Sequence, residues 1–314
     1  MGETRLNRGL CKSLLSTNNP ASEGYKMNAV KVANLPSDLP ILIAGPTASG
    51  KSALALQIAE ESGGIIINAD ALQVFDAWRI LTARPDDQDL KKAQHYLYGH
   101  IPFDGDYSVG HWLRDLNPFL SGPERPIIIG GTGLYFTALT EGLAEIPAIP
   151  QEVRAEANLL SSETMLGGLD TQTAERIDTQ NRVRVQRAWE VFRATGRTLT
   201  DWQNNTPPAA LPLNKCIPIT ILTDKKLLNT RIEKRFDLMI EMGALDEARK
   251  MLPHWNPSHL SSRAIGASEL IDHLKGNMSL KDARDKAIVA THQYAKRQRT
   301  WLRSRMKKWQ AYKI

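Results

Sequence analysis

Gly45-Pro46-Thr47-Ala48-Ser49-Gly50-Lys51-Ser52 is the stretch of this chain that decides the fold. It matches the pattern G-x-x-x-x-G-K-[ST], in which backbone N–H groups cradle a di- or triphosphate, the lysine reaches the terminal phosphates and the final hydroxyl holds Mg²⁺. An apolar run at residues 41–44 precedes the loop, and residues 52–61 follow it with helical spacing. A strand, a glycine-rich loop and a helix in this order predict a phosphate-binding site, which by itself is typical of ATP-binding and other nucleotide-binding proteins.

Other apolar runs predict a parallel sheet around this loop. Strands are expected at residues 40–44, 65–67, near 96–98, 126–129 and 217–222. Strands that alternate with helices predict an α/β fold, here a P-loop type of parallel sheet flanked by helices. Ligands of such sheets bind beyond the carboxyl ends of the strands. The loop, Asp70 and Thr132 each follow a strand, so we expect them to meet in one cleft.

Asp70 and Thr132 are the candidate catalytic residues. Asp70 could act as a general base, bind Mg²⁺ or cap the next helix. Thr132 lies in Gly130-Gly131-Thr132-Gly133, where a hydroxyl and free N–H groups would lie beside the phosphates. A tight turn between a strand and a helix would explain the same glycines.

The spacing of the strands predicts the domain organisation. Residues 1–38 are polar and lack periodicity, so we expect a disordered N-terminal extension. Almost ninety residues separate the strand that ends near residue 129 from the one that starts near 217. We therefore predict a helical insertion domain at 146–211 within a core formed by 39–145 and 212–314. From Lys225 onward the core is expected to be helical throughout.

Composition limits the classes of protein to consider. The chain has 314 residues and is 42% hydrophobic. No run approaches the ~20 apolar residues that a membrane-spanning helix needs. Two cysteines, Cys11 and Cys216, provide neither a disulfide framework nor zinc-ligand spacing, which favours the reducing cytoplasm. Nothing in the sequence indicates more than a monomer.

Positive charge is concentrated near the end of the sequence. Residues 281–313 contain eleven Lys and Arg against two Asp, whereas the whole chain carries +6. Lys296 and Arg297 lie there among Tyr294 and Trp301, a mixture that suits stacking and backbone contacts on RNA. A terminal helix that packs its aromatic residues on the core and leaves its charges in water is the alternative.

A second basic cluster lies in the predicted insertion. Arg184 and Arg187 are three residues apart, so they share a helix face. Their planar guanidinium groups suit phosphates or base edges, although a solvated helix face has the same composition.

These features together resemble the tRNA dimethylallyltransferases, also called tRNA isopentenyltransferases. The resemblance extends from about Leu42 to Arg303 and includes the phosphate loop. The other motifs, in order, are Asn68-Ala69-Asp70-Ala71-Leu72-Gln73-Val74-Phe75, Thr82-Ala83-Arg84-Pro85, Tyr107-Ser108-Val109, Gly130-Gly131-Thr132-Gly133-Leu134-Tyr135-Phe136, Arg184-Val185-Gln186-Arg187-Ala188, Arg263-Ala264-Ile265-Gly266 and Tyr294-Ala295-Lys296-Arg297-Gln298.

The resemblance implies transfer of a dimethylallyl group from dimethylallyl diphosphate to N6 of adenosine 37 in tRNA, with Mg²⁺ and a flipped-out base. Asp70 matches the residue that accepts the N6 proton, and Thr132 matches one close to both substrates. The loop from Thr47 to Ser52 matches the diphosphate cradle. The positions that match tRNA contacts are Asp70, Ala71, Leu72, Gln73, Thr132, Arg154, Val183, Arg184, Val185, Gln186 and Arg187.

Two other functions remain compatible with parts of the sequence. A P-loop kinase of a small metabolite or nucleoside would use the same loop, Mg²⁺ and Asp70 for phosphoryl transfer. It would not need the arginine cluster or the basic C-terminal region. A non-catalytic RNA-binding protein would not need Lys51, Asp70 and Thr132 to be intact.

Overall fold

The computed structural model describes residues 35, 36 and 38–313. The predicted disordered extension at 1–38 therefore lies almost wholly outside the described residues. At the centre is a six-stranded parallel sheet with the strand order β3-β2-β4-β1-β5-β6. The strands are β1 (Ile41–Ala44), β2 (Ile65–Asn68), β3 (His95–Tyr96), β4 (Pro126–Gly130), β5 (Ile217–Leu222) and β6 (Gln310–Lys313).

The central strands are almost continuous runs of isoleucine because helices cover both faces of the sheet. Ile41 of β1 is in register with Ile127 of β4 on one side and Ile217 of β5 on the other. All three side chains are at most 5% exposed. The strands predicted from these apolar runs are therefore present, and β1 delivers the phosphate loop at the middle of the sheet's carboxyl edge.

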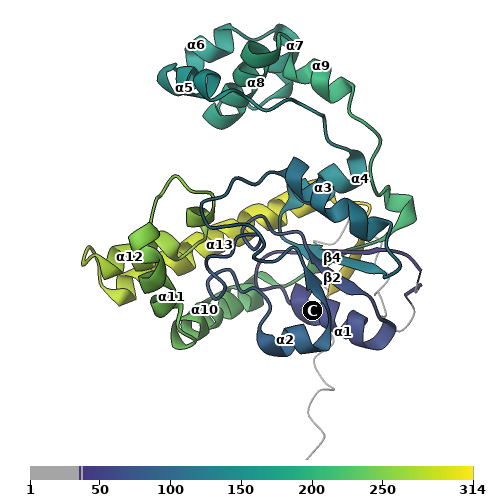
Figure 1. The fold of residues 1–314 in the computed structure, drawn as a ribbon, viewed down its shortest axis with the longest axis vertical. Helices are drawn as coiled ribbons and strands as arrows, with labels where there is room; N and C mark the ends of the chain where they lie inside the picture. The colour runs from purple at the N-terminus through teal and green to yellow at the C-terminus, as the bar shows by residue number, and fades with distance from the viewer. Residues whose placement is uncertain (1–34, 37, 314) are drawn as a thin grey trace, which may run out of the picture.

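Different helices cover the two faces of the sheet (Figure 1). On one face, α1 (Lys51–Ser62) packs Leu54 and Ile58 against the isoleucines of β1, β4 and β5. On the other face, α3 (Val109–Leu120) and α4 (Gly133–Glu141) contribute Trp112 and Phe136 to a second cluster. The short α2 (Asp87–Lys92) precedes the edge strand β3.

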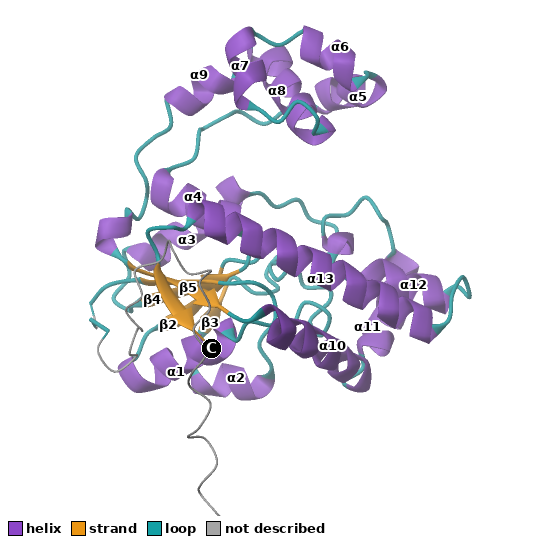
Figure 2. Cartoon of the chain, turned by 180° about the vertical axis from the view of Figure 1, so that it is seen from behind, coloured by secondary structure: helices purple, strands orange, loops and turns teal. Residues whose placement is uncertain are grey.

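A layer of helices extends the core beyond the sheet (Figure 2). Its apolar cluster joins Phe236, Leu270 and Ala287 to Trp78 from the segment after β2. The helices of this layer are α10 (Lys225–Glu241), α11 (Ala244–Met251), α12 (Ala267–Leu274) and the long α13 (Leu280–Arg305). Short 3₁₀ turns occur at η2 (Leu213–Lys215), η3 (Leu252–His254) and η4 (Ser261–Arg263).

The prediction that the chain is helical throughout from Lys225 is wrong at its end. After α13, residues Gln310–Lys313 form β6, which pairs in parallel with β5. Trp309 and Ala311 are buried while Gln310 is exposed, an alternation typical of a half-buried strand. The run is only four residues long and ends in a lysine, as edge strands often do, so its pattern is weak in the sequence.

Residues between α4 and β5 form a separate group of helices with hydrophobic clusters of their own. Ala157, Met165 and Val185 form one cluster, while Ala188 and Val191 belong to another. Figures 1 and 2 show this group standing away from the sheet and joined to it by two extended connections. The helices are α5 (Gln151–Leu159), α6 (Ser162–Gly167), α7 (Thr171–Arg176), α8 (Arg182–Thr195) and α9 (Leu199–Asn204). We refer to α5–α9 as the insertion.

Candidate active site

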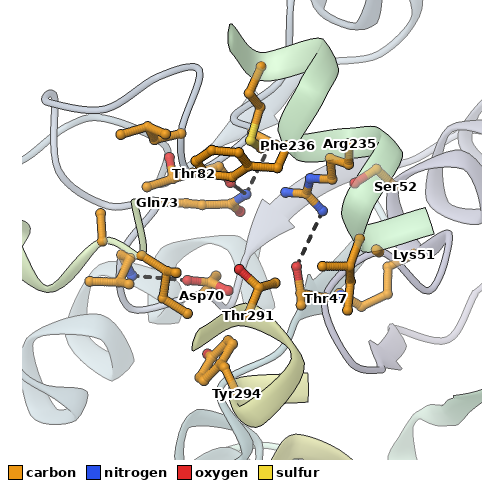
Figure 3. Close-up of a pocket in the computed structure, with 18 of the residues that line it drawn as sticks. Thr47, Lys51, Ser52, Asp70, Gln73, Thr82, Arg235, Phe236, Thr291 and Tyr294 are labelled. Carbon is orange, nitrogen blue, oxygen red and sulfur yellow. Dashed lines mark hydrogen bonds between the residues drawn. The ribbon is translucent and has the colours of Figure 1, made fainter. Parts of the chain in front are cut away.

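A cavity lies at the carboxyl edge of the sheet, where several separate segments meet (Figure 3). The phosphate loop forms one side and Asp70 lies across from it. Helices α10 and α13 contribute Arg235 and Tyr294. The lining residues are Thr47, Ala48, Lys51, Ser52, Asp70, Leu72, Gln73, Leu81, Thr82, Ala83, Ile129, Gly130, Ile232, Arg235, Phe236, Met239, Ala264, Ile265, Thr291 and Tyr294.

The phosphate loop has the curled backbone that anion binding needs. Gly50 has a φ of 94°, and Ala48 is held at a φ of 60°, which costs a side-chain-bearing residue energy. The loop lines the cavity with Thr47 and Ala48 and leads directly into the N-terminus of α1, whose dipole favours an anion. Lys51 donates from Nζ to the Pro46 carbonyl oxygen at 2.8 Å, so its ammonium group lies across the loop.

Two cations face the cavity beside this loop. Burial lowers the pKa of Lys51 to about 8, a change that Asp70 opposes and Arg235 reinforces. Burial also lowers the pKa of Arg235, again opposed by Asp70. The Arg235 Nη1 donates to the Thr47 hydroxyl at 3.3 Å. Two cations in a confined space favour a ligand with several negative charges, which a diphosphate provides.

Asp70 is held in place by a buried asparagine at the end of β2. Asn68 is fully buried, accepts from the Asp70 backbone N at 2.8 Å and donates to the Asp70 carbonyl at 2.9 Å. Trp112 in turn fixes Asn68 by donating from Nε1 to the Asn68 carbonyl at 2.7 Å. The Asp70 carboxylate accepts from the Leu72 backbone N at 3.0 Å and lines the cavity, so it does not cap a helix.

Thr132 lies behind the Asp70 segment and does not line the cavity. Its hydroxyl accepts from the Ala71 backbone N at 3.0 Å, and its backbone precedes α4 as the N-cap residue.

Of the neighbouring residues predicted to contact tRNA, Leu72 and Gln73 do line the cavity. Gln73 donates from Nε2 to the carbonyls of Thr82 and Ala83, so its side chain braces the rim.

The end of the cavity beyond the phosphate loop is largely apolar. Burial of an uncharged hydrocarbon group there would be favourable because the wall offers few polar partners. Phe236 and Met239 from α10 form part of this wall, opposite Leu81. The other apolar members are Leu72, Ile232, Ala264 and Ile265.

Helix α13 presents different residues to the cavity and to the outer surface. Thr291 and Tyr294 line the cavity, and burial near Asp70 raises the pKa of Tyr294. Lys296 and Arg297 are exposed and lie along a shallow groove with Trp301. The Trp301 ring also packs closely over Gly133. The Arg297 guanidinium lies over the Tyr294 ring, 5.8 Å from its centroid, but both charges face solvent, while Trp301 is partly used for packing.

The predicted tRNA-binding residues of the insertion are mostly at its surface. Val183 is 75% exposed and Arg184 is exposed next to it. Arg187 is half-buried, and burial lowers its pKa although Glu190 opposes this. Val185 is fully buried in the cluster with Ala157 and Met165, so its side chain packs inside the insertion.

Glu190 organises the polar side of this surface. It is 4% exposed and lies 3.9 Å from Arg154 Nε. Gln186 donates from Nε2 to Glu190 at 2.9 Å, and the same nitrogen donates to Asn158. Arg154, Gln186 and Arg187 are therefore brought together around one buried carboxylate.

Two polar residues of the site were not predicted from the sequence. Arg235 was not singled out because it lies within an unremarkable charged helix, far along the chain from the phosphate loop. Gln298 was quoted within a motif but without a role. Its side chain bonds to both Thr47 and Gly131. The available signal was a glutamine that shares a helix face with Ala295 and Leu302 on an otherwise highly charged helix.

Comparisons with known proteins bear on this geometry. A family model described as IPP transferase matches residues 73–305, and one described as isopentenyl transferase matches residues 40–100. A tRNA dimethylallyltransferase of Ruegeria sp. (strain TM1040) is 58% identical over 279 residues, covering 89% of this chain and 97% of that protein. The chain belongs to the tRNA dimethylallyltransferase family. Because this is a family of prenyltransferases, the alternative of a metabolite kinase is wrong.

Solved structures of the family share the fold. A full-length tRNA isopentenylpyrophosphate transferase from Bacillus halodurans matches with a TM-score of 0.63 at 27% identity, covering 88% of this chain and 89% of that one. A eukaryotic dimethylallyltransferase described as acting on tRNA matches with a TM-score of 0.72 at 23% identity, over 84% of this chain and 69% of that one. The second match shows the common fold.

Ser52 is the candidate metal-binding residue. Prenyltransferases of this kind generally use a divalent metal. Across residues 38–313 no cluster of three or more His, Cys, Asp or Glu could hold such an ion. Ser52 lines the cavity at the start of α1, where its hydroxyl would lie beside bound phosphate oxygens. One hydroxyl together with phosphate oxygens and water suits a hard cation, so the residues present fit the metal.

None of the described helices is both long and apolar enough to cross a membrane.

Cys216 is a free, buried thiol whose pKa is raised by burial to about 11. A thiol in this state is chemically inert and serves for packing.

Proposed function

We propose that this chain transfers the dimethylallyl group of dimethylallyl diphosphate to N6 of adenosine 37 in tRNA. The observation that carries the proposal is one cavity with three parts. The phosphate loop with Arg235 provides an anion site, the α10 wall provides an apolar site, and Asp70 provides a carboxylate between them. These parts suit a diphosphate, an allylic chain and a nucleophilic amine respectively.

Departure of the diphosphate leaves positive charge on the allylic carbon and negative charge on the leaving oxygens. Loop N–H groups, Lys51 and Arg235 would stabilise the leaving oxygens, which lowers the barrier to breaking the carbon–oxygen bond. The Phe236 side of the cavity would hold the allylic carbon close to the amine and exclude water. The N6 nitrogen then forms the new carbon–nitrogen bond.

Asp70 would orient the N6 amine and accept its proton as the carbon–nitrogen bond forms. Asn68 fixes the Asp70 backbone, and the Leu72 backbone N donates to the carboxylate, so the carboxylate would be oriented before the substrates arrive. Thr132, through the Ala71 backbone N, would steady the same segment. The products are the N6-dimethylallyl adenosine and inorganic diphosphate.

Mg²⁺ is the divalent metal that we propose for this site, held by the Ser52 hydroxyl together with the diphosphate. When bound it would neutralise charge on the leaving group. All other steps described above use the protein's own side chains and backbone.

The tRNA would reach the cavity from two sides. The target base must leave the anticodon loop before its N6 can approach Asp70. The insertion, through Arg154, Arg184 and Arg187, and α13, through Lys296 and Arg297, would hold the loop mainly by its phosphates. We also propose that the protein acts as a monomer in the cytoplasm.

Incubation with labelled dimethylallyl diphosphate, Mg²⁺ and an unmodified tRNA that has adenosines at positions 36 and 37 tests the proposal. We expect label in the tRNA and release of inorganic diphosphate. A matched tRNA with guanosine at position 37 should remain unlabelled. If neither tRNA gains label while the protein binds both substrates, the proposal is wrong.

A further inference from the structure

Gln298 joins α13 to two backbone segments of the active site. Its Oε1 accepts from the Thr47 backbone N at 2.8 Å, and its Nε2 donates to the Gly131 carbonyl at 3.0 Å. The side chain is only 6% exposed. One amide therefore connects the phosphate loop with the glycine turn that follows β4.

The Gln298 side chain lies behind the cavity wall and does not line the cavity. Thr47 does line it, and the Thr47 hydroxyl accepts from Arg235 at 3.3 Å. Thr47 is thus held by Gln298 through its backbone and by Arg235 through its side chain. This places Gln298 one contact away from the groups that would meet the leaving diphosphate.

The pair of contacts requires an amide and a glycine. Thr47 N is a donor and Gly131 O is an acceptor, so the partner must accept at one end and donate at the other. Glutamate cannot donate, and methionine can form neither bond. A Cβ at residue 131 would lie 2.1 Å from Gln298 Nε2, so any larger residue there would displace the amide.

We propose that Gln298 is a positioning residue that holds the phosphate loop in the shape that binds the diphosphate leaving group. A loop fixed before binding loses less conformational freedom when the anion arrives, so affinity is higher. The proposal rests on the proposed function only for the identity of the anion. Lys296 and Arg297 on the same turn of α13 are exposed, so the side chain that reaches the loop and those available to RNA are adjacent in sequence.

The test measures binding of inorganic diphosphate in the presence of Mg²⁺ by calorimetry, using the full chain. In Gln298→Met, which keeps the length of the side chain, we expect about tenfold weaker diphosphate binding because the loop must order on binding. Affinity for tRNA should be unchanged. Gln88→Met on the exposed α2 is the matched control and should bind both ligands like the wild type.

Gly131→Ala provides a second, independent route to the same effect. The added methyl group would push Gln298 Nε2 away, and the flexible end of that side chain can move. We again expect weaker diphosphate binding and unchanged tRNA binding. Gly167→Ala is the control because a Cβ there meets nothing within 4 Å. Gly131→Ala also answers the question if Gln298→Met fails to fold.

Unaltered diphosphate affinity in a folded Gln298→Met or Gly131→Ala protein would overturn the proposal. Equal weakening of diphosphate and tRNA binding would also overturn it, because that result indicates a general loss of packing. Failure of the wild type to transfer the prenyl group would contradict the proposed function instead. The diphosphate affinities need no transfer reaction, so the two failures are distinguishable.

Discussion

The phosphate-loop region and the insertion differ in how their functional residues are held. Around the loop, Thr47 is bonded to Gln298 and Arg235 from helices far along the chain, and the buried Asn68 holds the Asp70 backbone. In the insertion, Val183 and Arg184 extend from one surface helix, and the clusters beneath them contain only nearby residues. Fixed geometry suits bond breaking, whereas exposed charge on a separate unit suits gripping a large, flexible RNA. We therefore expect substitutions in the two regions to affect different measurements.

Asp70→Asn should give the largest effect on catalysis. Asparagine retains an oxygen that can accept from the Leu72 backbone N, so the local turn should survive. Loss of the base should lower kcat by about 10²- to 10⁴-fold. Single-turnover transfer and tRNA affinity should be measured in parallel, with Asp76→Asn on the same segment as the control. Comparable losses in kcat and tRNA affinity would remove Asp70 from the role of base.

Arg235→Gln should act on the diphosphate alone. Loss of a half-buried cation that bonds Thr47 should lower kcat/KM for the prenyl donor by about 10²-fold, as loss of a transition-state donor does elsewhere. Inorganic diphosphate should also bind more weakly, and tRNA affinity should not change. Arg231→Gln, one turn earlier on α10, is the matched control. Normal diphosphate binding in Arg235→Gln would contradict the assignment of diphosphate binding to the phosphate-loop region.

The double substitution Arg184→Ala with Arg187→Ala should show the opposite pattern. We expect about tenfold weaker tRNA binding. The slope of log affinity against log salt concentration should also fall in magnitude by about 1 to 2, because one or two phosphate contacts are lost. Diphosphate affinity should remain that of the wild type. Arg193→Ala, on the same helix but paired with Glu156, is the control. An unchanged salt slope would show that this face of α8 does not meet RNA.

A smaller effect should appear in the pH dependence of diphosphate binding. Burial lowers the pKa of Lys51 to about 8, and the bound anion needs the charged form. Below pH 8 that charge is already present, but above it binding must include uptake of a proton. Affinity should therefore fall as pH rises from 8 to 9, by up to about tenfold. Lys51→Arg remains charged, so identical pH profiles for the two proteins would contradict this assignment.

The meeting of the phosphate loop and Asp70 in one cavity could be predicted from the sequence, because each depends on local order. The phosphate loop needs its glycines, Lys51 and Ser52 next to each other, and Asp70 directly follows an apolar strand. Isoleucine runs predict the central strands for the same reason. These features result from neighbouring residues, so a one-dimensional pattern contains most of the information.

Local patterns could not predict the roles of Arg235, Gln298 and β6, because each acquires its role from a partner far along the chain. Arg235 is one charged residue among many on α10 until Thr47 is placed beside it. Gln298 matters because α13 crosses the ends of β1 and β4. β6 is defined by its register with β5 rather than by its own composition. For the insertion, the sequence indicates basic helices, but only the resemblance to a family indicates tRNA.

The central position of β1 has a consequence for how the protein folds. Ile41 is in register with Ile127 and Ile217, so the strand before the phosphate loop gains both neighbours only after long stretches of chain have been brought back. Contacts of this kind close large loops and form slowly, whereas the helices of the insertion can form from local contacts. During refolding, helical signal should therefore recover before the ability to bind diphosphate. Diphosphate binding is in this sense a measure of the completed fold.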